Sequence, residues 1–343
     1  MIHQTFENNI IHTVKDEISR QLMSKGCFTI PDIVERVGVS PTTVSKYVFE
    51  MQQKGILDIL DHVKTDKRGR RPILYGLKSD SNYHIGVDIK NYSLSIGLMD
   101  VAGNMVRTYL DDGFRFENTY PKFEEICSAV EGFITDAKIE NGVTSISSIC
   151  FSLGGRVNTF LGTSASIFNF EEFHTSPLTD VLETRFGCKV FVENDTKAMT
   201  YGEYQKIARK GIRNMLYVNI GWGLGLGVIV DGQLLHGHRG YAGELGHVSY
   251  YDNNILCHCG KKGCIETEVS GSAIHRKLIQ RIHNGEQSIL SGKVARGEEI
   301  TLQDILFAAE KEDPLCVDII TWTGSELGKH LAGLINIFSP DCI

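Results

Sequence analysis

The chain has 343 residues, more than one typical domain, and its content of 42% hydrophobic and 22% charged residues is that of a folded globular protein. This composition excludes a small disulfide-stapled scaffold and a wholly disordered chain. The nine cysteines are an odd number and three of them lie between Cys257 and Cys264, which favours metal-binding or core roles over a disulfide framework and indicates a reducing compartment.

No segment indicates export or a membrane span. The N-terminus lacks the succession of basic, apolar and small residues that marks a signal peptide. The richest apolar stretch, Met215 to Val230, contains four glycines and is shorter than the about 20 residues that a spanning helix needs. We therefore expect a cytoplasmic protein with no membrane partner.

Charge is unevenly distributed along the chain. The net charge is −7, yet residues 1–78 hold 12 Lys or Arg against 9 Asp or Glu and are net +3. The remaining residues are net −10, which disfavours their contact with a polyanion. Two parts with different partners are indicated.

Three helices are predicted near the N-terminus. Apolar residues recur every four positions from Ile10 to Leu22, and those from Ile30 to Val37 follow the i, i+3, i+4, i+7 pattern of a helix. The segment Gly38 to Pro41 then supplies a turn, the N-cap Ser40 and a proline at the first helical position. A third helix is expected from Pro41 to about Gln52, with apolar residues inward and short polar residues outward. This order is typical of a helix-turn-helix that lies in a major groove.

A basic wing is expected after these helices. Strand-like residues at 55–57 and 73–75 flank five Lys or Arg between Lys64 and Arg71, as in a hairpin whose tip contacts phosphates or the minor groove. A protein-interaction bundle with a solvated basic loop is the alternative, but the order of the two features favours DNA binding. The expected DNA-contacting residues are Ser40, Thr42, Thr43, Ser45, Lys46, Arg68, Arg70 and Arg71.

The rest of the chain predicts a duplicated α/β domain. Strands are expected over 85–89, 94–99 and 105–110, a helix over 123–137, a strand over 146–151, a helix over 178–186 and a strand over 189–192. A second strand group covers 215–220, 224–230 and 233–235, with helices at 273–282 and about 325–338. The repeated meander suggests two similar halves with a ligand cleft between them.

The strongest chemical signal is Gly243-Glu-Leu-Gly-His247 followed by Cys257-His-Cys259-Gly-Lys-Lys-Gly-Cys264-Ile-Glu266. Three thiolates and one imidazole form a complete tetrahedral shell for a structural Zn²⁺, so we predict His247, Cys257, Cys259 and Cys264 as ligands. His258 is a rival nitrogen ligand, but its position between two cysteine ligands should direct it elsewhere. The alternative, three reduced cysteines gathered by chance in a glycine-rich loop, is much less favoured.

Two further segments are candidates for ligand contact. Val192 to Asp195 lies where a buried strand ends and a helix begins, so Asp195 could act as a general base toward a sugar hydroxyl or serve only as a helix cap. Glycines alternate from Gly221 to Gly227, which permits close approach of a phosphate or simply forms a tight hairpin in the core.

In order and motif the chain resembles the ROK family of bacterial repressors and sugar kinases, over essentially its whole length. Its most specific element is Glu-x-Gly-His with Cys-x-Cys-Gly-x-x-Gly-Cys-x-Glu, present from Glu244 to Glu266. The resemblance implies a winged helix-turn-helix followed by a two-lobed, actin-like or ribonuclease-H-like α/β fold. The segment that ends in Gly69-Arg-Arg-Pro72 resembles the branch of xylose and N-acetylglucosamine repressors, because simple kinases of the family lack it.

The resemblance also implies sugar-contacting residues, whose carboxylates, amides and imidazole suit a ring of vicinal hydroxyls. They are Asn169, Asn194, Asp195, Glu244, His247 and Glu266. The zinc loop would lie beside the sugar and fix the two glutamates relative to each other.

Departures from the family pattern concern phosphate binding. Family kinases carry Asp-x-Gly-Gly-Thr where this chain has Asp88-Ile-Lys90-Asn91-Tyr92, and Trp222 stands where the family has threonine. A family Pro-Gly appears as Gly154-Gly155. The bulkier Lys90, Tyr92 and Trp222 disfavour ATP binding, although Asp195 is retained.

We therefore predict a sugar-responsive transcriptional repressor, not an enzyme, that binds operator DNA as a homodimer or higher homo-oligomer and responds to a sugar or amino sugar. The expected domains are a DNA-binding domain over 1–78 and two lobes over 83–200 and 201–343, the second without the usual C-terminal end of the family. An ATP-dependent sugar kinase with Asp195 as catalytic base, or a repressor whose ligand is a protein, are the alternatives.

Overall fold

The computed structural model describes residues 14–62, 72–78, 80, 82–168, 170, 176–208 and 211–343. By its internal contacts the chain divides into two compact units. The first comprises Met1–Leu153 and Leu161–Val192, and the second comprises Gly154–Phe160 and Glu193–Ile343.

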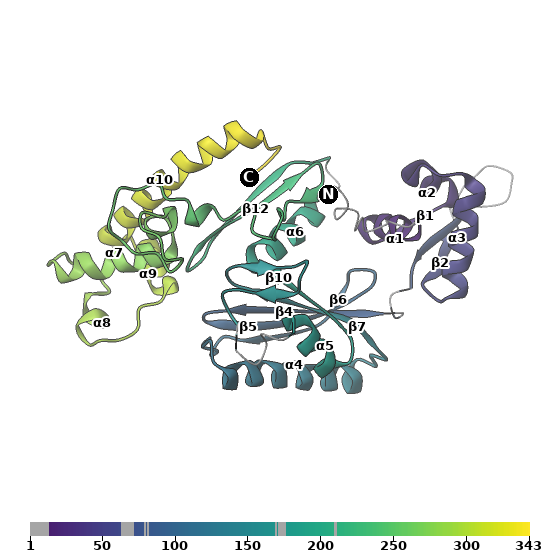
Figure 1. The fold of residues 1–343 in the computed structure, drawn as a ribbon, viewed down its shortest axis with the longest axis horizontal. Coiled ribbons are helices and arrows are strands. Elements are labelled where there is room, and N and C mark those ends of the chain that lie inside the picture. Colours follow the sequence, from purple (N-terminus) through teal and green to yellow (C-terminus); the bar gives the residue numbers. More distant parts are fainter. Residues whose placement is uncertain are drawn as a thin grey trace, which may run out of the picture. The chain divides into compact units, whose positions relative to one another are not determined.

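The first unit begins with three helices and a small sheet (Figure 1). Its elements are α1 (Val14–Lys25), β1 (Cys27–Phe28), α2 (Ile30–Val37), α3 (Pro41–Gln53), β2 (Leu57–His62) and β3 (Ile73–Leu77). The strand order is β1-β3-β2, and β2 pairs with β3 in antiparallel fashion. The predicted second and third helices and the wing strands are confirmed; α1 confirms the first helix from Val14 onward, whereas Ile10 lies outside the described residues.

Local chemistry explains where these helices begin and end. The Thr29 side chain caps α2 in a capping box with Asp32, and Gly38 ends the helix in the left-handed region at φ 71°. Ser40 caps α3 as predicted, since its hydroxyl accepts a hydrogen bond from the Thr43 amide. The apolar stripe of α3, which includes Val44 and Val48, is buried in the core of this segment, so the opposite face of α3 is left to solvent.

A five-stranded sheet forms the rest of the first unit, in the order β10-β7-β4-β5-β6. Strands β4, β5 and β6 form an antiparallel meander, and β7 lies parallel to β4. Helix α4 lies along one face of the sheet (Figure 1) and buries its apolar stripe there. The elements are β4 (Tyr83–Lys90), β5 (Ser93–Asp100), β6 (Met105–Asp111), α4 (Tyr120–Glu140), β7 (Ile146–Leu153), β9 (Thr163–Ser164), α5 (Leu178–Phe186) and β10 (Lys189–Asn194).

The second unit repeats the meander. Strands β11, β12 and β13 pair in antiparallel order, and Met215 in β11 forms a parallel bridge with Cys342 as β4 pairs with β7 in the first unit. Helix α6 packs on β11 and β12. The elements are β8 (Val157–Asn158), α6 (Asp195–Ile207), β11 (Met215–Ile220), β12 (Leu224–Val230), β13 (Gln233–Leu234), the 3₁₀ helices η3 (Leu245–His247) and η4 (Ile265–Thr267), and the helices α7 (Gly271–His283), α8 (Ser291–Ala295), α9 (Leu302–Glu310) and α10 (Pro314–Phe338).

Some C-terminal elements differ from the sequence-based expectation. Helix α10 begins at Pro314, with Asp313 as its N-cap, and not near Ser325. Helices α8 and α9 were not predicted; the short α8 has no buried residue and α9 has only two, so neither gives a strong periodic signal. Their contacts with α7 and α10 form a separate apolar cluster. None of the helices in the described ranges has the length and apolar character to cross a membrane.

Candidate functional site

Three cysteines and one histidine of the second unit converge at one point. The ligand atoms of His247, Cys257, Cys259 and Cys264 all lie within 4.8 Å of one another. The Cys257 Sγ lies 3.5 Å from His247 Nδ1, and the Sγ atoms of Cys259 and Cys264 are 3.6 Å apart. If Zn–S distances are ~2.3 Å and Zn–N distances ~2.0 Å, these two separations match the distances between neighbouring ligand atoms of a tetrahedral zinc site. The donor set therefore fits a structural Zn²⁺.

Tight local structure brings these ligands together. Residues His247 and Cys264 adjoin the two 3₁₀ helices, η3 and η4, which contact each other. Gly263, at φ 71°, lies so close to the Tyr251 backbone that a Cβ would come within 2.0 Å of the Tyr251 carbonyl oxygen. Burial raises the pKa of the Cys257 and Cys264 thiols in the metal-free protein, and a bound cation would reverse this by stabilising the thiolates.

The rival ligand His258 pairs with Glu266 but also lies near one of the cysteines. Its Nδ1 is 3.0 Å from Glu266 Oε1 and 4.0 Å from Cys257 Sγ. His247, His258 and Glu266 also meet the distance criterion for a metal, but this set has no thiolate and shares His247 with the first set. The four-ligand set is the better fit for zinc because it is complete and rich in sulfur.

The two glutamates of the motif both lie near His247. Glu244 Oε2 is 3.7 Å from His247 Nε2, on the side of the ring opposite Nδ1 and the cysteines. Glu266 Oε2 accepts a hydrogen bond from the Leu224 amide at 3.1 Å, which ties it to β12. Burial by itself would raise the pKa of Glu266, but the hydrogen bonds from His258 and Leu224 lower this pKa below its ordinary value, so the carboxylate is ionised.

Asn194 and Asp195 lie where β10 ends and α6 begins. Asn194 is the N-cap, since its side-chain oxygen accepts from the Lys197 amide at 3.1 Å and its Nδ2 donates to the Gly155 carbonyl at 2.9 Å. Asp195 is the first helical residue, and its Oδ1 accepts from the Thr196 amide at 2.7 Å. The cap is therefore Asn194, which leaves the Asp195 carboxylate at the positive end of the helix dipole. Asn169, the remaining predicted sugar contact, lies outside the described residues.

The alternating glycines serve helix packing on β12. A Cβ on Gly225 would lie 2.1 Å from Thr196 Oγ1, and one on Gly227 would lie 1.7 Å from Thr200 Oγ1. Both glycines thus allow α6 to approach the strand, which favours the tight core packing over phosphate approach at these two positions. Trp222, at the start of the run, packs against His275 of α7 with ring centroids 5.5 Å apart and ring planes tilted by 51°.

In the first unit, the residues at the family's phosphate motif interact with each other. Lys90 Nζ lies 3.2 Å from Asp88 Oδ2, and the Ser152 hydroxyl donates to Asp88 Oδ1 at 2.9 Å. The Arg115 guanidinium lies over the Tyr92 ring, 5.0 Å from its centroid. Lys90, paired with Asp88, stands where the family motif has glycine, and the Tyr92 ring under Arg115 stands where it has threonine.

The outward face of α3 presents a set of polar residues. Thr42, Ser45 and Lys46 are exposed, whereas Thr43 is half-buried and shares a hydrogen bond with the exposed Ser40 hydroxyl at 2.8 Å. Helix spacing places a further exposed residue, Phe49, on the same face. The predicted wing contacts Arg68, Arg70 and Arg71 lie outside the described residues.

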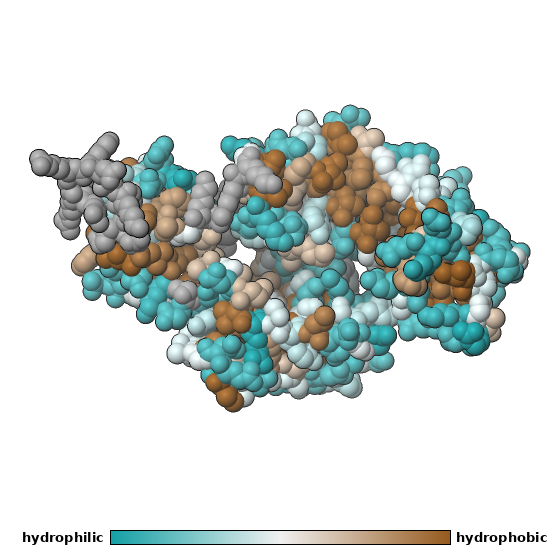
Figure 2. Space-filling view, turned by 180° about the vertical axis from the view of Figure 1, so that it is seen from behind, coloured by the Kyte–Doolittle hydropathy of each residue, from teal (hydrophilic) through white to brown (hydrophobic). Residues whose placement is uncertain are grey.

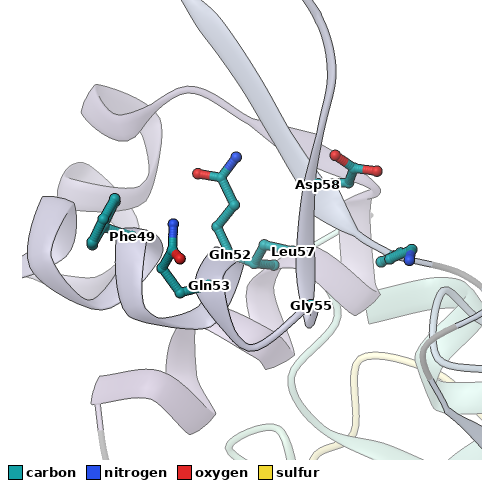
Figure 3. Close-up of a pocket in the computed structure, with 7 residues that line it drawn as sticks. Phe49, Gln52, Gln53, Gly55, Leu57 and Asp58 are labelled. Carbon is teal, nitrogen blue, oxygen red and sulfur yellow. The ribbon is translucent and has the colours of Figure 1, made fainter.

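Phe49 is a residue that the sequence reasoning missed. Its side chain is 61% exposed and projects from α3 beside Gln53, at the edge of an open hollow of about 570 Å³ (Figure 3). Its spacing of seven from Thr42 and four from Ser45 was the available signal, because residues so spaced share one helix face. Apolar side chains on a recognition helix can contact the thymine methyl group.

The fold and the site together define a class of protein: a DNA-binding winged helix joined to a sugar-kinase-like α/β domain. A ROK family profile matches residues 84–343, and a winged helix-turn-helix DNA-binding profile matches residues 17–58. The chain belongs to the ROK family.

Its relatives include regulators and kinases. The DNA-binding transcriptional repressor Mlc of Escherichia coli K12 is 26% identical over 91% of this chain and 75% of its own length. The glucokinase of Streptomyces coelicolor is 32% identical over 75% of this chain and 78% of its own length. The crystal structure of a ROK family transcriptional regulator homologous to E. coli Mlc superposes with a TM-score of 0.76 at 26% identity, covering 95% of this chain and 81% of that one.

Proposed function

We propose that the protein is a sugar-responsive transcriptional repressor that regulates carbohydrate metabolism. The observation that supports this most is the extent of the similarity: the regulators align along both the winged helix and the ROK domain, whereas the glucokinase aligns over 75% of the chain. In this proposal residues 1–78 bind the operator, and residues 83–200 and 201–343 form the two lobes of the sugar-binding domain.

Operator binding would use the outward face of α3. Thr42, Ser45 and Lys46 would donate hydrogen bonds to base edges and phosphates, and Phe49 would contact a thymine methyl group. Ser40, Thr43 and the wing residues Arg68, Arg70 and Arg71 complete the proposed interface. A homodimer is the simplest assembly, because a two-fold axis matches two operator half-sites.

The effector would be a monosaccharide or amino sugar bound beside the zinc loop. Asp195, Glu244 and Glu266 offer carboxylate oxygens to hydroxyls, and His247 Nε2 lies on the Glu244 side of its ring, away from the cysteines. Asn194, whose amide is engaged with Gly155 and Lys197, would mainly orient Asp195. Asn169 would complete the set.

A structural Zn²⁺ on His247, Cys257, Cys259 and Cys264 would hold this pocket in shape. When bound, the ion supplies charge stabilisation for three thiolates and a rigid cross-link between the segments that bear Glu244 and Glu266. The sugar in turn would act on DNA binding only through different affinities for two arrangements of the protein.

Operator selection followed by gel-shift titration tests the proposal. A sequence-selective complex should be enriched from random duplexes, and one member of a panel of mono- and amino sugars should change its affinity. The double variant Ser45→Ala/Lys46→Ala should lose the complex, while Lys15→Ala, on α1 and paired with Glu50, should keep it. Absence of sequence-selective binding at every sugar concentration would exclude a repressor.

An ATP-dependent sugar kinase with a DNA-binding head is the second candidate, supported by Asp195 and by the 32% identity to the glucokinase. Against it, Lys90 pairs with Asp88 where the family motif has glycine. ADP release in the presence of the sugar panel, with Asp195→Asn as the control, separates the two functions. Failure of every sugar to raise the melting temperature would instead favour a protein ligand.

A further inference from the structure

One buried cation lies beside the candidate sugar residues and has no role in the site described so far. Lys197, in the first turn of α6, is only 2% exposed. Its ammonium donates to the Gly240 carbonyl oxygen, and no second acceptor lies within hydrogen-bonding distance in the described part of the chain. A lysine is almost never buried in this way without compensating charges.

The carboxylates around Lys197 supply that compensation. Glu193, Asp195 and Glu244 are near enough to stabilise its charged form. Burial nevertheless lowers the pKa of Lys197 below its ordinary value, so the cation depends on these neighbours. The dependence is mutual, because carboxylates that lie near one another repel without a cation between them.

The same lysine connects two segments of the site. The loop from His236 to Glu244 contacts α6 and the end of β10 twice: Gly240 accepts from Lys197, and His236 Nε2 lies 2.8 Å from Glu193 Oε2. Glu193 and Lys197 flank Asn194 and Asp195 in the sequence, so both contacts hold the loop next to these two residues. Glu244 follows directly on this loop.

We propose that Lys197 is a positioning residue of the sugar pocket: its ammonium holds the Glu244 loop against the start of α6 and offsets the negative charge of the carboxylates gathered there. The inference rests on the proposed function, because it assigns Lys197 to the same sugar. It implies that the pocket accepts neutral or amino sugars, whose hydroxyls would donate hydrogen bonds to the carboxylate oxygens of Asp195 and Glu244.

Two substitutions separate the charge of Lys197 from its hydrogen bond. Lys197→Met removes both at a similar volume, and because it takes one partner out of a buried charge cluster we expect it to lower the melting temperature. Lys197→Gln keeps a donor for Gly240 and removes only the charge. Lys293→Met is the control, since it deletes a lysine of the same unit that pairs with Asp304, away from the residues of the proposed pocket.

Calorimetric titration of zinc-loaded full-length protein with the sugar that binds the wild type is the test, with melting temperature and zinc content measured alongside. Lys197→Met should keep the zinc content and fold yet bind the sugar at least about tenfold more weakly. Lys197→Gln should lie between it and the wild type, and Lys293→Met should bind as the wild type does.

Sugar affinity within about twofold of the wild type in folded Lys197→Met would overturn the positioning role. If that variant fails to fold, Lys197→Gln decides, and wild-type affinity there would also overturn it. A wild-type protein that binds no sugar at all is a different result: it removes the proposed function itself, and the positioning role with it.

Discussion

Removal of one cysteine from the metal cluster should have a large and zinc-dependent effect on stability. Cys264 is fully buried, and its Sγ lies 3.6 Å from that of Cys259. Cys264→Ala leaves three ligands, and an incomplete shell no longer holds zinc as a structural site does. At free zinc about a thousandfold above the dissociation constant, the lost binding is worth about 4 kcal/mol of unfolding free energy. For a domain of this size the melting temperature should fall by about 8–16 °C.

Scanning calorimetry with and without a chelator measures this effect, and elemental analysis gives the zinc content. The chelator should lower the melting temperature of the wild type and leave that of Cys264→Ala unchanged. Cys316→Ala removes an equally buried thiol of the same unit that lies in the α7–α10 cluster, so it should retain zinc and its response to chelator. Equal chelator responses in the wild type and Cys264→Ala would refute the four-ligand assignment.

Three further predictions concern other parts of the structure. Phe49→Ala should weaken operator binding about tenfold in gel shifts while changing folding stability by less than about 0.5 kcal/mol. Met23 is also exposed but lies on α1, so Met23→Ala should change neither quantity. Equal operator affinities for the two variants would show that Phe49 does not contact the operator. Gly227→Ala should lower the unfolding free energy by about 1–3 kcal/mol in denaturant titrations, because the alanine Cβ would clash with α6. An unchanged unfolding free energy would mean that α6 moves aside without cost. Burial tends to raise the pKa of Glu193, but its hydrogen bonds, with that from His236 foremost, lower this pKa below 4.5. Ionised Glu193 therefore stabilises the folded protein above pH 4.5, and this stabilisation is lost as the pH falls through the folded-state pKa. Glu193→Gln should therefore flatten the loss of melting temperature below pH 4.5 relative to the exposed-site control Glu203→Gln, and identical acid profiles for the two variants would contradict this.

Local sequence signals identified the elements that have strong apolar periodicity or clear capping and turn residues at their ends. Ser40 and Pro41 fixed the start of α3, and the meander of the first unit followed from alternating apolar residues between Tyr83 and Asp111. These signals failed for short segments that bury only a few side chains. Helices α8 and α9 are examples, since their few apolar contacts come from α7 and α10, which lie elsewhere in the sequence.

The candidate site shows the same division. Cysteine and histidine spacing was sufficient to predict that His247, Cys257, Cys259 and Cys264 gather at one point, because few protein functions other than metal binding place three thiols and an imidazole so close together. The function of the alternating glycines was not decided by sequence: only the packing of Thr196 and Thr200 against Gly225 and Gly227 reveals a helix where a phosphate was one possible neighbour.

The sequence by itself therefore determined the strongly patterned helices and strands, the Cys/His motif and the basic N-terminal segment, since each depends on residues that are close in the chain. The tertiary structure decided which distant groups meet. It placed the Lys197 ammonium on the Gly240 carbonyl and left Phe49 exposed on the outer face of α3. The physical reason is that burial and charge compensation depend on the packing of separate segments, and no local pattern of residues encodes that packing.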